Sequence, residues 1–387
     1  PLRANSGTAY GAPLGPVRFS HERGLFTTGE KIELTLDHDD PEAQIYYTTD
    51  HSDPSATNGV KYVRGTKIGI SKTTIVRATA EKAGALPYRN ITAHSYIYPD
   101  QVMQQEKPAC AADDWWTDST KYASKHTGNP DWPNGSCRPS YKPSENVIKD
   151  AKSLADFVAS IHAAPVVSVT MSDYAMFNPT DGLHSKPCDA KGNPGGELPA
   201  SVEWVSGSGD SAPVFGLLTG LKAQGGWGRY FDGSSKKSFQ LKFRKRYGKS
   251  KLQEDVLGAA GCPRKTFKSL ILRAEFHDSW TESSISTQPR GSNMKDEFWR
   301  ELSDPVLGYA VWGSHVHLYI NGLYWGLYNL TEHADEDLAA EIGGGEGDDY
   351  VMMKNKAGSD SNDVVSGDKT QYFNVATPLW QAGVACT

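Results

Sequence analysis

The chain has 387 residues, a length that favours two or three folding units over one. Its 38 glycines, 22 prolines, 18 tyrosines and 10 tryptophans exclude a helical bundle and predict a turn-rich chain with much β structure. The 46 acidic and 40 basic residues are mixed along the sequence, which excludes a broad basic field for nucleic acid, and no run approaches 18 apolar residues, which excludes a membrane-spanning segment.

The N-terminal part of the chain reads as a short extension followed by a β-rich module. We assign residues 1–15 to the extension, and the start at Pro1, without an initiator Met or an apolar leader, suits a processed or trimmed product. Residues 16–99 alternate short apolar or β-branched runs with turns, which is typical of a small β-sandwich. The predicted strands are Lys31–Leu36, Ile45–Thr49 and Thr74–Ala80.

One turn of this module carries several oxygen-bearing side chains. Asp50, Asp53 and Asn58 could hold a structural Ca²⁺ together with turn carbonyls, or they could simply form an Asx-rich turn. The run Ile45–Pro54, followed by Tyr62, Ile70, Arg77-Ala78 and Tyr96-Ile97, resembles the chitobiase/β-hexosaminidase C-terminal accessory module. The resemblance implies an immunoglobulin-like spacer or a carbohydrate-associated module without catalysis.

Residues 100–160 form an expected linker that ends in a helix. The linker is rich in Pro, Asn, Ser and Lys, and it contains Trp115, Trp116 and Trp132, which would anchor the loop or form a ligand-binding platform. A helix is predicted from Asn146 to Ile161.

The five cysteines carry no CxxC pair and no His at the spacing of a structural zinc site. In an oxidising compartment we expect one or two disulfides and one remaining thiol. Cys110 with Cys137 is the preferred pair, because both lie in a stretch with little else to stabilise it.

The remaining residues, 161–387, mix strands with helices and predict an α+β fold. Phe239 and Leu241 alternate with polar neighbours, as a half-buried strand requires, whereas Met294, Phe298 and Leu302 lie at helical spacing. The predicted strands are Pro165–Thr170, Ser201–Val205, Val214–Leu218, Ser238–Arg244, Ser269–Arg273, His315–Ile320 and Tyr350–Lys354, and the predicted helix is Lys295–Leu302.

This region contains several short motifs. The most specific is the run HLYINGLYWGLY at 317–328, followed by Glu332 and Asp335. The others are Pro165–Val169, Pro199–Glu203, Gln224-Gly225-Gly226, Lys236–Phe239, Tyr247–Leu252, Leu272-Arg273-Ala274, Asp278-Ser279-Trp280 and Asp296-Glu297-Phe298. Together these motifs resemble the CotH kinase-like family, in the version found in large secreted bacterial proteins. The resemblance implies an atypical kinase-like fold for 161–387, and relatives of this architecture usually run on into further modules.

Phosphoryl transfer from ATP needs a cation and backbone donors on the phosphates. Lys236 or Lys237 could pair with the phosphates, and Gly225 and Gly226 would let backbone N–H groups approach, although the same glycines could form a plain tight turn. Arg229 completes the predicted nucleotide-binding set.

The reaction also needs carboxylates. The resemblance assigns Glu332 and Asp335 to the catalytic site, with Asp335 and Asp360 as ligands of Mg²⁺ or Mn²⁺. Asp363 and Asp368 are rivals of Asp360, and acids at the start of a surface helix are the structural alternative for Glu332 and Asp335. His315 and His317 share a strand face and could bind a metal or simply pack.

The sequence therefore predicts a secreted or surface-exposed bacterial protein, with an immunoglobulin-like β-sandwich before an atypical Ser/Thr kinase-like domain. Its expected partners are a surface or coat protein substrate, other copies of the chain or neighbouring modules, and no nucleic acid. A non-catalytic structural or adhesive protein that keeps the fold as a scaffold is the alternative. A carbohydrate-binding assembly built on Trp115 and Trp116 is the third possibility.

Overall fold

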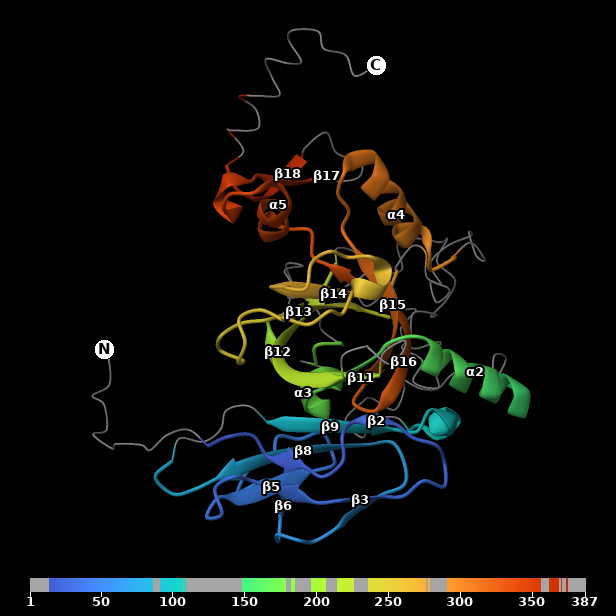
Figure 1. Ribbon diagram of the computed structural model, residues 1–387, viewed down its shortest axis with the longest axis vertical. Helices are drawn as coiled ribbons and strands as arrows, with labels where there is room; N and C mark the ends of the chain where they lie inside the picture. Colours follow the sequence, from blue (N-terminus) through green and yellow to red (C-terminus); the bar gives the residue numbers. More distant parts are fainter. Residues whose placement is uncertain are drawn as a thin grey trace, which may run out of the picture. The chain divides into compact units, whose positions relative to one another are not determined.

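The computed structural model describes residues 14–85, 91–106, 108, 148–178, 182–184, 196–206, 214–225, 236–275, 278, 291–355, 362–368, 370 and 374. The chain divides into two compact units (Figure 1). Unit 1 comprises Pro1–Phe298 and Trp312–Thr331, and unit 2 comprises Trp299–Val311 and Glu332–Thr387. Unit 1 contains an N-terminal β module and a barrel, and unit 2 contains a short helix and a β-hairpin.

The N-terminal module is built around one apolar core, to which Leu34, Ile45 and Val76 contribute. A five-stranded sheet has the order β2-β9-β8-β5-β6, and β3 pairs with β7 and β1 with β4. The strands are β1 (Arg18–Phe19), β2 (Gly24–Leu25), β3 (Ile32–Leu34), β4 (Leu36–Asp37), β5 (Gln44–Thr48), β6 (Val60–Lys61), β7 (Ile68–Ile70), β8 (Thr74–Glu81) and β9 (Thr92–Ile97). This β-rich module is consistent with the predicted sandwich.

The β8 strand is buried on both faces, as its pattern of side chains requires. Val76 and Ala78 belong to the core of the module, whereas Ile75 and Arg77 lie on the opposite face and are equally buried. Because alternate residues of a strand point to opposite faces, a second layer must cover the Ile75 face.

That second layer is a closed seven-stranded barrel of order β10-β11-β12-β13-β14-β16-β15. The pairs β10–β11, β11–β12, β12–β13, β13–β14 and β15–β16 are antiparallel, and the parallel pairing of β10 with β15 closes the barrel. The strands are β10 (Val166–Thr170), β11 (Leu198–Ser206), β12 (Phe215–Gln224), β13 (Ser238–Lys242), β14 (Ser269–Arg273), β15 (Gly313–Ile320) and β16 (Leu323–Glu332). The predicted α+β class is confirmed, with the barrel as its largest element.

The core of the barrel uses the period-2 pattern of the strands. Phe239 and Leu241 of β13 join Leu221, Leu272 and Leu318 in one apolar cluster, and their sequence neighbours point the other way. Trp204 stacks on Phe215 at a centroid distance of 4.7 Å. The predicted alternation in β13 therefore placed the correct side chains in the core.

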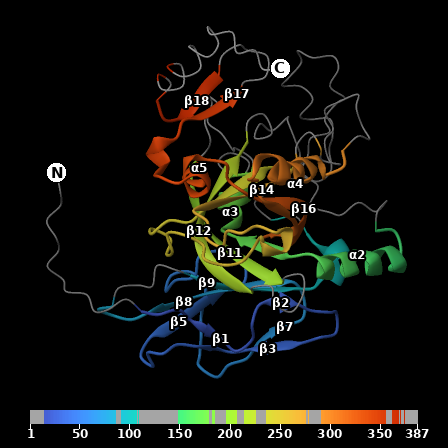
Figure 2. The same cartoon turned by 45° about the horizontal axis from the view of Figure 1, so that its top comes forward.

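The outer face of the barrel packs against the module. The β9 and β2 strands lie directly beside β11 in both cartoon views (Figures 1 and 2). A satellite cluster joins Ile97 of the module, Val166 and Tyr319 of the barrel and Ile161 of the helix α2 (Ala151–Ala163). Buried polar groups lie beside it: the Ser95 amide and hydroxyl donate to the Glu203 carboxylate, and the Ser95 and Ser168 hydroxyls lie 2.9 Å apart.

Among the described residues, unit 1 also contains α-helices, 3-10 helices and the first turn of a helix that continues into unit 2. The α2 helix begins at a capping box in which the Asp150 carboxylate accepts from the Ser153 amide at 2.7 Å, so it starts later than the predicted Asn146. The elements are η1 (Pro99–Gln104), α2 (Ala151–Ala163), α3 (Asp173–Phe177) and η3 (Gly258–Ala260).

Unit 2 combines a short helix with a hairpin. The Tyr350 hydroxyl donates to the Gly344 carbonyl at 2.6 Å and ties the end of the helix to the start of the hairpin. Its elements are α5 (Glu336–Gly343), η5 (Gly347–Asp349), β17 (Met352–Asn355) and β18 (Asn362–Ser366), and the last turns of α4 (Lys295–Leu307) also belong to it. Among the described residues, none of the helices is long and apolar enough to cross a membrane.

Candidate functional site

The hairpin between β12 and β13 brings a predicted glycine next to the predicted lysines. Gln224 pairs with Ser238, so Gly225, directly after β12, lies across from Lys237, directly before β13. Gly225 is exposed and has a φ of 109°, a conformation in which a Cβ would be strained. Its backbone can therefore approach a ligand closely. Gly226 and Arg229 lie outside the described residues.

Lys237 is buried, with 1% of its surface exposed, although a lysine normally keeps its amine in water. Its backbone carbonyl accepts a hydrogen bond from the buried Tyr328 hydroxyl at 3.0 Å, which ties the start of β13 to the middle of β16. Burial raises the pKa of Tyr328, so this hydroxyl stays protonated and donates. The hydrogen bond from Tyr328 thus fixes the backbone of Lys237.

Lys236 lies in an aromatic environment. Its Nζ is 4.4 Å from the centroid of the Trp325 ring, and Trp325 in turn packs against Phe177 and His184. Burial lowers the pKa of Lys236 to about 7, because the charged amine loses its hydration. The two adjacent lysines therefore have different surroundings: Lys237 is buried, and the amine of Lys236 lies over the face of the Trp325 ring.

The predicted catalytic acids lie in unit 2. Glu332 is the last residue of β16 and is buried. Asp335 is the N-cap of α5: its Oδ1 accepts from the Leu338 amide at 3.1 Å, and its Oδ2 lies 2.6 Å from His333 Nδ1. The helix-start geometry that the sequence offered as an alternative is thus present at Asp335. A carboxylate in this position is favoured by the dipole of the helix.

The predicted metal ligands are only partly visible. Asp360 lies outside the described residues, Asp363 lies on β18, and the exposed Asp368 accepts from the Thr370 amide at 2.8 Å. In the described part of the chain, no group of three His, Cys, Asp or Glu side chains is arranged to hold a metal ion. The Mg²⁺ or Mn²⁺ site remains a prediction.

The two histidines of β15 have separate hydrogen-bond partners. His315 Nε2 lies 2.7 Å from the Asn293 carbonyl, and His317 Nε2 lies 2.9 Å from the Ser160 carbonyl. Each imidazole therefore joins its strand to a neighbouring segment, as packing residues do. Metal ligation by this pair has no support in the described residues.

Some of the other residues proposed from the sequence are described by the structure, and some lie outside the described residues. In the turn after β5, Asp53 pairs with Arg77 at 2.6 Å and Asp50 accepts from the Ser52 amide, so the Asx-rich turn is present and Ca²⁺ remains a prediction. Cys262 is buried and unbridged. Trp115, Trp116, Trp132 and the pair Cys110 and Cys137 lie outside the described residues.

Sequence reasoning missed the role of Asp278. Its carboxylate accepts from the amides of Ser292, Met294 and Lys295 at 2.8, 2.8 and 2.9 Å, and the Lys295 amine lies 2.9 Å away. Asp278 therefore caps α4 from a distant part of the chain. The only signal was the Asp-Ser-Trp motif, which does not reveal a partner 14 to 17 positions further on.

Comparison with known families adds two matches. Residues 221–381 match the model described as CotH kinase protein, and residues 34–96 match the model described as Fn3 associated. None of the curated proteins matches the chain significantly. The first match begins within β12 and includes both lysines, Asp278, Glu332 and Asp335. The second lies within the β-rich N-terminal module and supports its interpretation as an accessory module.

Proposed function

We propose that this chain, which carries a CotH-family kinase-like domain behind an Fn3-associated module, transfers phosphate from ATP to Ser or Thr hydroxyls of extracellular surface or coat proteins. The observation that carries the proposal is the β12–β13 hairpin. It places Gly225, whose backbone can approach a ligand closely, across from Lys237, whose backbone is fixed by Tyr328. A lysine and a glycine at neighbouring ends of one β-ladder suit the phosphates of a nucleotide.

In the proposed reaction the hydroxyl oxygen of the acceptor attacks the γ-phosphorus of ATP. The bond between that phosphorus and the oxygen bridging to the β-phosphate breaks, so ADP leaves with the bond electrons, and the hydroxyl proton passes to a carboxylate. Glu332 and Asp335 are the proposed carboxylates of the site, with Asp335 and Asp360 as metal ligands. Bound Mg²⁺ would neutralise charge on the phosphates.

The setting of the reaction is part of the proposal. The match to the CotH family model is compatible with an extracellular protein. Disulfide formation outside the cell would also suit the five cysteines. The acceptor is then a protein presented at the surface, and other copies of the chain are candidate neighbours.

A non-catalytic scaffold is the second candidate, and one observation favours it. Both carboxylate oxygens of Asp335 already have partners inside unit 2, the Leu338 amide and the His333 ring. A residue that only starts a helix would look like this. The same fold would then serve a structural or adhesive protein.

A pair of variants distinguishes the kinase from the non-catalytic scaffold. Asn is as good an N-cap as Asp, whereas Ala loses the cap, so Asp335→Asn removes the charge and retains the helix start. The kinase proposal expects Mg²⁺-dependent ATP binding, measured by calorimetry, and transfer of the γ-phosphate to a Ser/Thr-rich acceptor to fall at least tenfold in Asp335→Asn, with unchanged thermal stability.

The matched control is Asp150→Asn, which makes the same change at the N-cap of α2. It should leave both nucleotide binding and stability unchanged. If the wild-type chain shows no Mg²⁺-dependent heat with ATP, or if Asp335→Asn binds and transfers like wild type, the scaffold is the correct function.

A further inference from the structure

The segment that follows β13 is strongly basic, although the chain as a whole has a net charge of -6. Residues 242–251 contain six lysines and arginines and no acidic residue. Arg244, Lys245, Arg246 and Lys249 of this segment are all exposed. Among the described residues, both arginines pair with the single carboxylate of Glu197, and neither Lys245 nor Lys249 forms an ion pair. One carboxylate therefore leaves most of this positive charge unbalanced.

Glu197 positions the two arginines. The Arg244 Nε donates to Glu197 Oε2 at 3.1 Å, and Arg246 donates to the other oxygen of the same carboxylate. A Cβ at Gly220 would overlap with this carboxylate, so the bare backbone of β12 leaves room for it. The Arg246 guanidinium also lies over the Tyr247 ring, 4.7 Å from its centroid. Both guanidinium groups are thus oriented before any ligand arrives.

Glu197 uses only part of the hydrogen-bonding capacity of the two arginines. A guanidinium carries five N–H donors, and each arginine gives one hydrogen bond to Glu197. The side chains of Arg244 and Arg246 are 49% and 57% exposed, so further N–H groups reach water. Burial alone would raise the pKa of Glu197, but the hydrogen bond from Arg246 and the charge of Arg244 outweigh burial and hold that pKa below its usual range. The carboxylate therefore stays ionised and retains both arginines at neutral pH.

We propose that Arg244 and Arg246, with Lys245 and Lys249 beside them, bind a phosphate group carried on a Ser or Thr of a protein partner. A guanidinium can pair with phosphate oxygens through two parallel N–H groups, whereas a lysine acts as a point charge. A phosphorylated Ser or Thr carries a charge of about -1.5 to -2 at pH 7 and three strong acceptor oxygens, more than a carboxylate offers. The surface supplies both the charge and the donors that this group requires.

The source of the partner rests on the proposed function, because the product of that reaction is a protein that carries such a phosphate. Lys237 precedes β13 and Arg244 follows it, and seven residues of extended chain span about 23 Å. A flexible acceptor with several hydroxyls can bridge that length. The surface would then hold an acceptor by a residue that is already phosphorylated while another hydroxyl reaches the nucleotide.

The test measures the binding of a fluorescent synthetic peptide to the full chain by anisotropy, without ATP and without added metal. The peptide is neutral apart from one phosphoserine. Comparison peptides carry Ser or Glu at the same position, and inorganic phosphate serves as a competitor. Because no nucleotide is present, an inactive kinase site would not change the result, and a failure of phosphopeptide binding would leave the proposed phosphate transfer standing.

The first variant combines Arg244→Lys with Arg246→Lys. It keeps the charge of both positions and an amine for Glu197, and it removes the planar guanidinium groups. Circular dichroism and the thermal transition would check that the variant folds as wild type does. A loss of affinity in this variant then reports the recognition of the phosphate by guanidinium groups, which charge alone does not explain.

The second variant combines Lys245→Gln with Lys249→Gln, two exposed positions at which the change should leave the fold intact. The matched control is Lys31→Gln with Lys72→Gln, which removes the same charge from two exposed lysines of the N-terminal module. Comparing the two double variants separates a local effect of the lysines from the change in net charge.

We expect wild type to bind the phosphoserine peptide at least tenfold more tightly than the Ser and Glu peptides. Affinity should fall about tenfold in the arginine variant and about threefold in the lysine variant, and it should be unchanged in the control. Three results would each overturn the proposal: a Glu peptide that binds as tightly as the phosphoserine peptide, inorganic phosphate that competes as well as that peptide does, or an arginine variant that binds like wild type.

Discussion

The guanidinium of Arg23 lies 3.1 Å from the carboxylate of Glu203, and the two side chains are only 7% and 1% exposed. Arg23 belongs to the N-terminal module and Glu203 to β11 of the barrel, so this ion pair crosses the junction between them. Ser95 of the module donates two further hydrogen bonds to the same carboxylate. Charges removed from water persist only with such partners.

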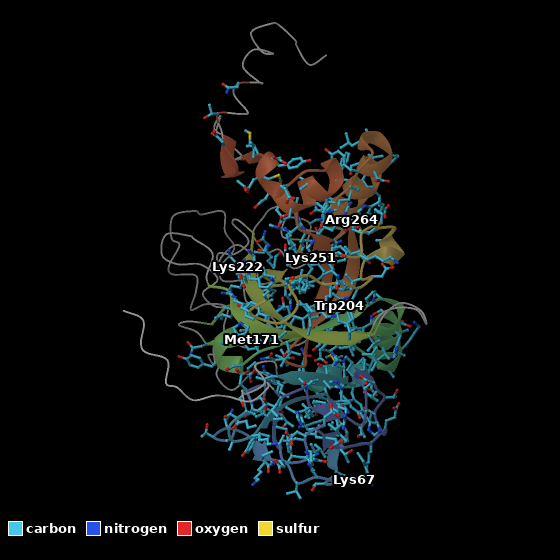
Figure 3. All side chains as sticks on the ribbon, turned by 60° about the vertical axis from the view of Figure 1, so that its left-hand side comes forward. Lys67, Met171, Trp204, Lys222, Lys251 and Arg264 are labelled. Carbon is cyan, nitrogen blue, oxygen red and sulfur yellow. The ribbon has the colours of Figure 1, made fainter. Side chains whose placement is uncertain are left out.

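Replacing Glu203 with Gln should therefore destabilise the chain by about 3–5 kcal/mol, because Arg23 would remain buried without a counter-charge. Chemical denaturation of the full chain would measure this loss. The matched control is Glu33→Gln, because Glu33 pairs with Lys67 on the exposed surface of the N-terminal module. Figure 3 labels Lys67 in that module. That change should cost less than about 1 kcal/mol. Equal losses in the two variants would contradict the role given to the junction.

Asp278→Asn should loosen the start of α4. Burial alone would raise the pKa of Asp278, but hydrogen bonds from Lys295 and Ser292 outweigh it and hold that pKa well below its usual range. The pKa of Asp278 is lower in the folded chain than in the unfolded chain, so below about pH 4 the unfolded chain binds more protons than the folded chain does. The stabilisation is therefore present above about pH 4 and is lost as the pH falls.

At pH 7 the Asp278→Asn variant should be less stable than wild type by about 1.5–3 kcal/mol, since an amide cannot accept all these hydrogen bonds. The difference should shrink between pH 5 and pH 2.5, because Asp278 of the unfolded wild-type chain takes up a proton in this range while the folded carboxylate stays ionised. Urea denaturation at the two pH values measures it. A difference that is constant with pH would show that the charge of Asp278 is not what stabilises α4.

Lys236→Met should raise stability at neutral pH. The pKa of Lys236 is lowered to about 7 in the folded chain, so between pH 7 and pH 10 the unfolded chain binds more protons and wild-type stability rises with pH. Methionine keeps the contact with the Trp325 ring and removes the cost of burying the amine. The gain over wild type should be largest at pH 6–7 and should disappear near pH 10, as thermal unfolding in matched buffers would report.

Tyr328→Phe should weaken both the fold and the proposed nucleotide site. The variant leaves the buried Lys237 carbonyl without its donor and should cost about 1–2 kcal/mol. If Lys237 contacts the phosphates, ATP affinity measured by calorimetry should fall as well. Tyr98→Phe makes the same change in the module, where the hydroxyl donates to the Glu30 carbonyl, and should lower stability without affecting nucleotide binding. If the two variants bind ATP with identical affinity, the Tyr328 hydroxyl does not support the nucleotide site.

The local elements of the fold could be predicted because their signals are local. Phe239 and Leu241 alternate with polar residues, and β13 appears at that place. The start of α2 was placed five residues early, although the pair Asp150 and Ser153, which forms the observed capping box, was available as a signal. Hydrophobic periodicity predicts that a helix or strand is present more reliably than it predicts the residue at which the element begins.

The long-range features could not be predicted in the same way. Phe298 and Leu302 of α4 lie at the predicted helical spacing, yet both are exposed, and the partners of Asp296 and Glu297 lie on strands far away in the sequence. Glu203 lies in a run that resembles a family motif, but its partners Arg23 and Ser95 are more than 100 residues away in the sequence. At the candidate site, the glycine and lysine motifs could be located in the sequence, but the pairing of β12 with β13 and the burial of Lys237 depend on the barrel as a whole.

The parallel pairing of β10 with β15 has a practical consequence for anyone who isolates the part of the chain that matches the CotH model. The family match begins at residue 221, inside β12, so a fragment cut there would lack β10 and β11. Both β12 and β15 would then present unpaired backbone groups along an open margin. Such a fragment should aggregate on expression, whereas one that begins before β10 retains a ring without free margins.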